Sequence, residues 1–161
     1  MKECIDIILK KADDCYSNQD FLGASKNIEE AVSEDSGNAE LWATWGNVEF
    51  QAGNFAVAIQ KYREACRLSP QTPEYWTYLA VALLKDDNVE EFEISLESAL
   101  NIDPFHAEAL KFLGDLYFQN NKKTEAAHSY YKILVNDPDN TEVLMRLGCC
   151  LYECGEIDVA K

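Results

Sequence analysis

Thiols and imidazoles are the side chains of this chain that could ligate a metal ion or act as a nucleophile and its base. Six cysteines are present, at Cys4, Cys15, Cys66, Cys149, Cys150 and Cys154. Cys150 and Cys154 would lie one turn apart on a helix and could share a ligand. The two histidines, His106 and His128, are distant from this pair in the sequence. We therefore predict reduced thiols that act as small apolar side chains, and no metal site.

The same side chains do not form a catalytic pattern. The sequence contains no nucleophile with an adjacent base and no glycine-rich loop of the kind that cradles a phosphate. His106 follows Pro104-Phe105, and His128 lies two positions after Ala126. We interpret both histidines as surface residues rather than general bases. The sequence thus predicts no catalytic residue, no cofactor and no enzymatic activity.

The net charge narrows the class of partner. The 161 residues include 14 Lys and Arg against 29 Asp and Glu, which gives a formal charge of −15. Nucleic acids and anionic membranes are bound through clustered cations, so we expect neither as a partner. No run approaches the roughly 20 apolar residues of a membrane span, and the first eleven residues lack the pattern of a secretory signal. The expected location is the cytoplasm.

Small side chains recur every 34 residues, which indicates that the chain is built from repeats. One column is Ala24, Ala58, Ala126 and Ala160, interrupted by Phe92. A second is Ala12, Gly46, Ala80, Gly114 and Gly148, and a third is Ala31, Ala65, Ala99 and Ile133. Bulky columns run beside them, namely Ile8, Trp42, Trp76, Leu110 and Leu144, and Ile28, Tyr62, Leu96 and Tyr130. Pro70, Pro104 and Pro138 separate successive units, because proline biases its predecessor away from helix.

Inside each unit, apolar residues recur three and four positions apart, which is helical spacing. The pattern predicts first helices at 5–18, 39–52, 73–86, 107–120 and 141–154. It predicts second helices at 21–34, 55–68, 89–101 and 123–135, and no strand pattern competes. Gly53 and Gly155 fall in the turn inside a unit, where glycine readily adopts the left-handed conformation that ends a helix.

The segment from Trp42 to Gly46, followed by Gly53-Asn54, Ala58, Tyr62, Ala65 and Pro70, resembles a tetratricopeptide repeat (TPR) almost position for position. The resemblance extends over residues 5 to 161, as units at about 5–38, 39–72, 73–106 and 107–140 and a partial unit at 141–161. It implies an all-α fold, a right-handed α-solenoid of tandem helix-turn-helix units forming a single domain over 1–161. The last unit stops inside its second helix. We expect a fragment of a longer protein, with self-association through the open C-terminal end as the alternative.

The resemblance also implies that the first helices line a concave face that binds an extended segment. Carried onto this sequence, the predicted peptide-binding residues are Tyr16, Asn47, Phe50, Leu84, Asp115, Phe118 and Tyr152. The bulky members of this set are common in the repeat itself, so packing is an equal alternative to ligand binding. Acidic residues beside the groove predict a peptide or protein partner with apolar anchors and Lys or Arg between them.

One specialised use of the fold is not predicted. Chaperone adaptors of the family hold a C-terminal carboxylate with Lys, Asn and Arg from successive first helices. The matching positions hold Leu9, Asp13, Thr44, Glu74 and Tyr78, or Ala43, Asn47, Tyr78, Glu108 and Phe112 one unit later, and only Asn47 fits. We therefore expect a protein-interaction scaffold or adaptor. The alternative is the N-terminal interaction module of a multidomain enzyme, for example a transferase, whose catalytic domain lies beyond Lys161.

Overall fold

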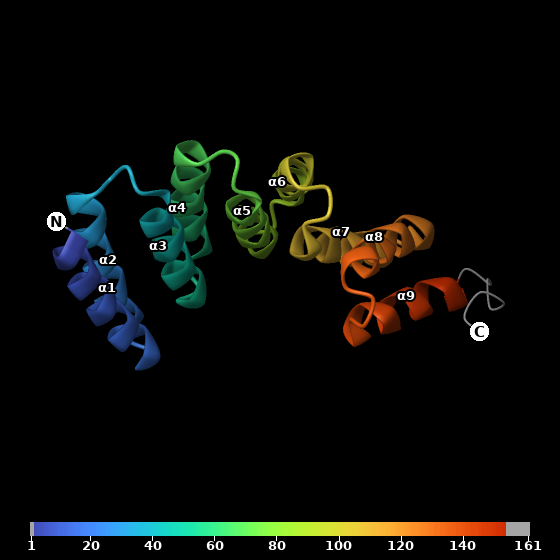
Figure 1. Cartoon of the computed structure of the whole chain (residues 1–161), viewed down its shortest axis with the longest axis horizontal. Helices are drawn as coiled ribbons and strands as arrows, with labels where there is room; N and C mark the ends of the chain where they lie inside the picture. The colour runs from blue at the N-terminus through green and yellow to red at the C-terminus, as the bar shows by residue number, and fades with distance from the viewer. Residues whose placement is uncertain (1, 154–161) are drawn as a thin grey trace. The chain divides into compact units, whose positions relative to one another are not determined.

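The computed structural model describes residues 2–153, and within them the backbone forms nine α-helices and no strand (Figure 1). The first helices of the repeats are α1 (Lys2–Ser17), α3 (Ala39–Gln51), α5 (Pro73–Lys85), α7 (Ala107–Gln119) and α9 (Thr141–Glu153). The second helices are α2 (Phe21–Glu34), α4 (Phe55–Leu68), α6 (Val89–Ile102) and α8 (Lys123–Asn136). These bounds agree with the predicted helices to within a few residues. The predictions for Cys154, Gly155, Ala160 and a further second helix lie outside the described residues.

The helix ends follow from the local sequence. Asp20 caps α2, since its carboxylate accepts a hydrogen bond of 2.9 Å from the backbone N–H of Gly23. The side chain of Asn38 accepts from the N–H of Glu40 at the start of α3. Helix α5 begins with Pro73, whose fixed φ suits the first helical position and whose missing N–H would have had no partner there.

The turn inside each repeat uses one left-handed residue at a constant position. The residues are Gln19, Gly53, Asp87 and Asn121, with φ of 61°, 81°, 59° and 60°. The N–H of the next residue bonds back to the carbonyl five positions earlier in every case, as from Asn54 to Glu49 at 2.9 Å, which is a Schellman-type helix end. The predicted conformation of Gly53 is therefore confirmed, and the same turn forms in three repeats without glycine.

The chain divides into two compact units, which we call the N-terminal unit (Met1–Ser95) and the C-terminal unit (Leu96–Lys161). In the N-terminal unit, α1 packs on α2, α2 on α3, α3 on α4 and α4 on α5. A core cluster there includes Ile8, Ala12, Ala24, Ile28, Ala31, Leu41 and Trp45. In the C-terminal unit, α8 packs on both α7 and α9 around Leu110, Ala126, Tyr130, Ile133, Val143 and Cys150.

The small-residue columns mark close contacts between helices. Gly46 faces the ring of Tyr62, and a Cβ at Gly46 would lie 2.5 Å from Cε1 of that ring. Gly114 faces Tyr130 in the same way, with a corresponding distance of 2.7 Å. Real Cβ contacts are not this short, so the tyrosine ring excludes any side chain at the glycine. In the two repeats where this column holds alanine, the residue sixteen positions later is aliphatic, namely Ile28 after Ala12 and Leu96 after Ala80.

Candidate functional site

The tyrosines that face the glycines reach the first helices and hold two of the predicted site residues. The hydroxyl of Tyr62 donates to Oδ1 of Asn47 at 2.8 Å, and the hydroxyl of Tyr130 donates to Oδ1 of Asp115 at 2.5 Å. Burial raises the pKa of both phenols well above the ordinary range, so both hydroxyls stay protonated as donors. Asn47 and Asp115 are therefore oriented by the protein itself.

In the N-terminal unit, the first helices carry a run of three cavities that we call the N-terminal face. Their volumes are about 410, 260 and 320 Å³, and Thr44 lines all three. The first lies beside Ile5 and Leu9, the second beside Tyr16 and the third beside Tyr75 and Tyr78. The cavities thus follow α1, α3 and α5 in succession, with apolar and aromatic side chains in each.

The N-terminal face carries negative charge that no cation among the described residues neutralises. Five carboxylates line its cavities, those of Asp6, Asp13, Asp35, Glu40 and Glu74, and no Lys or Arg lines them. Among the described residues, none of the five has an ion-pair partner. Burial, and then the charges of Glu40 and Glu74, raise the pKa of Tyr75. This surface is therefore electrostatically suited to a cationic ligand.

The predicted aromatic anchors of this unit also pack within their own repeats. Tyr16 meets Phe21 edge-on at 5.8 Å between ring centroids, and Phe50 meets Phe55 edge-on at 5.3 Å. Each pair joins the end of a first helix to the start of the second. Tyr16 is nevertheless 40% exposed and lines a cavity, whereas Phe50 and Leu84 are half buried. Packing and ligand contact are compatible at Tyr16.

In the C-terminal unit, the first helices carry a single cavity of this kind among the described pockets, of about 320 Å³, which we call the C-terminal face. It is lined by Phe118, Tyr130, Glu142, Met145, Arg146 and Cys149. Met145 is 65% exposed, and the nearby predicted residue Tyr152 is 71% exposed. Of the predicted residues, Phe118 therefore lines this cavity together with Tyr130, whose hydroxyl donates to Asp115. Tyr152, on α9, is exposed to solvent.

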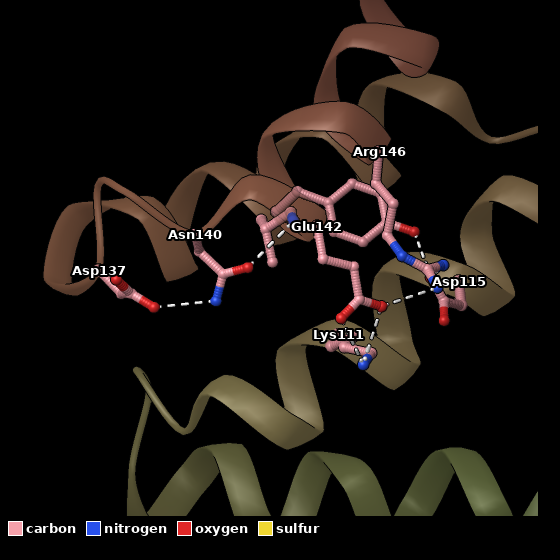
Figure 2. Close-up of polar contacts among 8 residues, drawn as sticks. Lys111, Asp115, Asp137, Asn140, Glu142 and Arg146 are labelled. Carbon is pink, nitrogen blue, oxygen red and sulfur yellow. Dashed lines mark hydrogen bonds and ion pairs between the residues drawn. The ribbon is translucent and has the colours of Figure 1, made fainter.

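Unlike the N-terminal face, the C-terminal face balances its own charges. Figure 2 shows Arg146 and Glu142 of α9 directed toward Asp115 and Lys111 of α7. Arg146 donates to Asp115 and also to Oε1 of Glu142 at 3.1 Å, and Nζ of Lys111 lies 3.1 Å from the same Glu142 oxygen. Hydrogen bonds from Lys111 and Arg146 lower the pKa of Glu142. Two cations thus face two carboxylates, and little net charge is left for a ligand.

Thr44, Tyr78 and Arg146 were missed as predicted site residues, although they line the cavities of the two faces. A signal was present, because Thr44, Tyr78, Phe112 and Arg146 are spaced by 34 residues and form one column on the first helices. This position could be missed because its residue type differs from repeat to repeat, although its place on the first helix is the same in each.

The histidines take different places. His106 precedes α7 at its N-cap position, and its Nε2 is buried without a hydrogen-bond partner in the described part of the chain. His106 is half buried, so its ring is partly covered at a junction between repeats. His128 is exposed. Among the described side chains, residues 5–153, His, Cys, Asp and Glu form no group that could hold a metal ion. No helix in that range is both long and apolar enough to cross a bilayer.

Comparison with known proteins places this geometry among tandem helical repeats. Residues 46–87 match a family model described as TPR repeat, and residues 92–141 match one described as Tetratricopeptide repeat. A small glutamine-rich tetratricopeptide repeat-containing protein 2 from Mycosarcoma maydis is 31% identical over 113 residues, which are 70% of this chain and 32% of that protein. The chain spans about a third of the length of the curated relatives it matches first.

Solved structures show the same fold. The crystal structure of MamA protein superposes with a TM-score of 0.80 at 22% identity, over 99% of this chain and 87% of that one. The first TPR of Spaghetti (RPAP3), bound to the HSP90 peptide SRMEEVD, superposes with a TM-score of 0.67 at 24% identity, over 75% of this chain and 96% of that one. At these identities the likeness concerns the fold.

Proposed function

The chain belongs to the tetratricopeptide repeat family, and from this premise we propose that it is a protein-interaction scaffold whose first helices bind a segment of another protein. The repeats support this function because they place side chains at a constant position on successive first helices, as in the column of Thr44, Tyr78 and Arg146. An extended or helical segment can then contact several repeats at once.

The uncompensated charge of the N-terminal face carries the proposal about the partner. A segment with Lys or Arg would gain favourable electrostatic energy from five carboxylates that form no ion pair with the described residues, and its apolar side chains would contact Tyr16, Tyr75 and Tyr78. The TPR of Spaghetti is bound to a peptide that ends in Glu-Glu-Val-Asp. Because no Lys or Arg lines the N-terminal cavities, we propose a basic partner here rather than an acidic one.

A displayed library of random twelve-residue peptides tests this proposal with a defined probe. Peptides selected on the chain should be enriched in Lys and Arg together with a bulky apolar residue. Their affinity should fall as salt is raised from about 0.05 to 0.5 M, since exposed charges are screened over about 10 Å at 0.1 M.

Charge reversal on the N-terminal face should abolish that enrichment. The test variant is Glu40→Lys combined with Glu74→Lys, and the control is Glu30→Lys combined with Glu34→Lys on the second helix α2, where both carboxylates are exposed. The control has the same net charge. If both variants select the same basic peptides, or if wild-type selections are not enriched in cations, the N-terminal face is not the binding surface.

A further inference from the structure

A second groove lies in the C-terminal unit, apart from the C-terminal face. It has a volume of about 410 Å³ and lies among the Leu96–Ile102 part of α6, α7 and α8. Leu110, Leu113 and Tyr117 of α7 form an apolar wall, and His128 and Lys132 of α8 lie on the polar wall. None of these residues lines the cavity beside Phe118 and Arg146, so the groove is a separate surface.

An earlier repeat of the same chain shows what fits this position. Leu110 and Leu113 are the counterparts, 68 residues later, of Trp42 and Trp45. The two indole rings stack at 5.7 Å with an interplanar angle of 22°, and Nζ of Lys61 lies 3.3 Å from the ring centroid of Trp45. Lys61 corresponds to Ser129 in the later repeat. Two indoles and a lysine are thus replaced by two leucines and a serine, and all three smaller residues line the groove.

The groove also contains a positive charge, that of Lys132, which is not paired within the described part of the chain. Lys132 is half buried and forms no ion pair or hydrogen bond with the described residues. The other described cations of the unit are engaged, since Lys111, Lys123 and Arg146 pair with carboxylates and Lys122 lies 5.7 Å from the ring centroid of Tyr117.

The negative charge of the groove lies at its other end. Glu125, in the first turn of α8, accepts a hydrogen bond of 2.7 Å from the hydroxyl of Thr124. That bond is the main reason that its pKa is lowered, so the carboxylate is ionised at neutral pH. Lys132 lies two turns further along α8, and the groove is therefore negative at the start of the helix and positive toward its end.

From the replacement of two indoles by Leu110 and Leu113 and from the ammonium of Lys132, which has no partner among the described residues, we propose that this groove binds a partner segment that inserts an aromatic side chain against the two leucines. A carboxylate next to that aromatic residue pairs with Lys132. The occupant differs from the basic segment assigned to the N-terminal face, and the inference does not depend on that assignment. An aromatic anchor in a pocket supplies most of the binding energy at such surfaces, and the charge pair fixes its orientation.

Two short peptides that differ in one charge test the proposal on the full chain. They are acetyl-Gly-Trp-Glu-Gly-amide and its glutamine counterpart, titrated into ¹⁵N-labelled protein and followed by amide chemical shifts. Shifts are expected at Leu113, Tyr117 and His128. The glutamate peptide should bind about two- to fivefold more tightly, which is the range of a partly exposed ion pair. Lys132→Gln should reduce this ratio to about one, whereas Lys85→Gln, at an exposed lysine of the N-terminal unit, should preserve it.

Filling the groove gives an independent readout. Leu113→Trp copies Trp45 of the earlier repeat, so the variant should fold with an unchanged helical circular dichroism spectrum and should bind both peptides at least about tenfold more weakly. Unchanged affinity in a folded Leu113→Trp variant would overturn the proposal. So would equal affinity for the two peptides, or shifts confined to Phe118 and Met145. If Leu113→Trp does not fold, the proposal is tested by the ratio of the two peptide affinities in Lys132→Gln. A ratio that stays at the wild-type value in that variant would then overturn it.

Discussion

The contact between Gly46 and Tyr62 predicts a specific failure when alanine replaces the glycine. The added Cβ would lie 2.5, 2.6 and 3.0 Å from Cε1, Cδ1 and Cζ of the Tyr62 ring. These atoms belong to a rigid aromatic ring, and the hydroxyl at the end of that ring donates to Oδ1 of Asn47 at 2.8 Å. The ring cannot swing aside without losing that hydrogen bond, so α3 and α4 must separate.

Two opposing terms set the magnitude. Overpacking of a core by one methyl group costs about 1–3 kcal/mol, and replacing a glycine inside a helix by alanine returns about 1 kcal/mol. We therefore expect Gly46→Ala to destabilise the N-terminal unit by roughly 0–2 kcal/mol. In a Tyr62→Leu background the clash is absent, because Leu with Ala is the pairing of residue types at Leu96 and Ala80. There Gly46→Ala should stabilise by up to about 1 kcal/mol.

Urea unfolding of the wild type, the two single variants and the double variant measures the coupling. All three tryptophans, Trp42, Trp45 and Trp76, lie in the N-terminal unit, so their fluorescence reports its unfolding. These four proteins form a double-mutant cycle, which should give a coupling free energy of about 1–3 kcal/mol. The Tyr62 hydrogen bond is lost in both proteins that carry Tyr62→Leu, so its loss cancels in the coupling. Additive effects of the two substitutions would refute the steric account. Gly148→Ala, followed by far-UV circular dichroism because Gly148 lies in the C-terminal unit, serves as a control, since its added Cβ meets no described atom within 4 Å apart from its chain neighbours and its own helix backbone.

Three further outcomes follow from single sites. Burial alone would raise the pKa of Glu49, but hydrogen bonds from Ser25, Asn54 and Trp45 lower it overall. The ionised carboxylate therefore stabilises the folded state, and this contribution to the free energy of unfolding is complete above pH 4.5 and is lost as pH falls below that value. In urea unfolding at pH values between 3 and 6, Glu49→Gln should weaken the dependence of the free energy of unfolding on pH. An unchanged pH dependence would contradict the stabilising role of the Glu49 carboxylate. Burial raises the pKa of the Cys66 thiol to about 12, so a disulfide reagent should label exposed Cys149 in the folded protein and reach Cys66 only on unfolding; equal labelling rates would contradict this. Gln19→Gly should stabilise by up to about 1 kcal/mol in thermal unfolding, because φ of 61° strains a side chain but not glycine; destabilisation would show that the Gln19 side chain contributes more than the strain costs.

The helices could be predicted from the sequence because their packing imposes a fixed period. Close approach requires small side chains at the same point of each hairpin, and Ala24, Ala58 and Ala126 are fully buried there. The left-handed turn could be predicted only at Gly53. At Gln19, Asp87 and Asn121 the conformation is imposed by the backbone hydrogen bonds that close the helix end, and these depend on both flanking helices rather than on residue type.

For the candidate site, the sequence could predict only which positions recur every 34 residues on the first helices. The period placed Asn47 and Asp115 on the first helices, but which cation neutralises which carboxylate depends on side-chain geometry across repeats. Arg146 reaches Asp115 over 31 positions of sequence. The buried carboxylate of Glu49 is a similar case, because the equivalent positions hold the apolar Leu83 and the aromatic Tyr117. A charge is tolerated there since Ser25, Trp45 and Asn54, from three different segments, all donate to it.

The contrast between the two first-helix faces has a consequence for how one fold accommodates different partners. The backbone position is shared, yet the column of Thr44, Tyr78 and Arg146 supplies a hydroxyl, a phenol and a guanidinium. The guanidinium pairs with the carboxylates of Asp115 and Glu142, whereas within residues 5–153 no cationic side chain pairs with Glu40 or Glu74. Since uncompensated charge steers association and packing alone does not, charge-reversing substitutions on the N-terminal face should act mainly on the association rate of a basic segment with that face, and substitutions of its apolar cavity residues mainly on the dissociation rate.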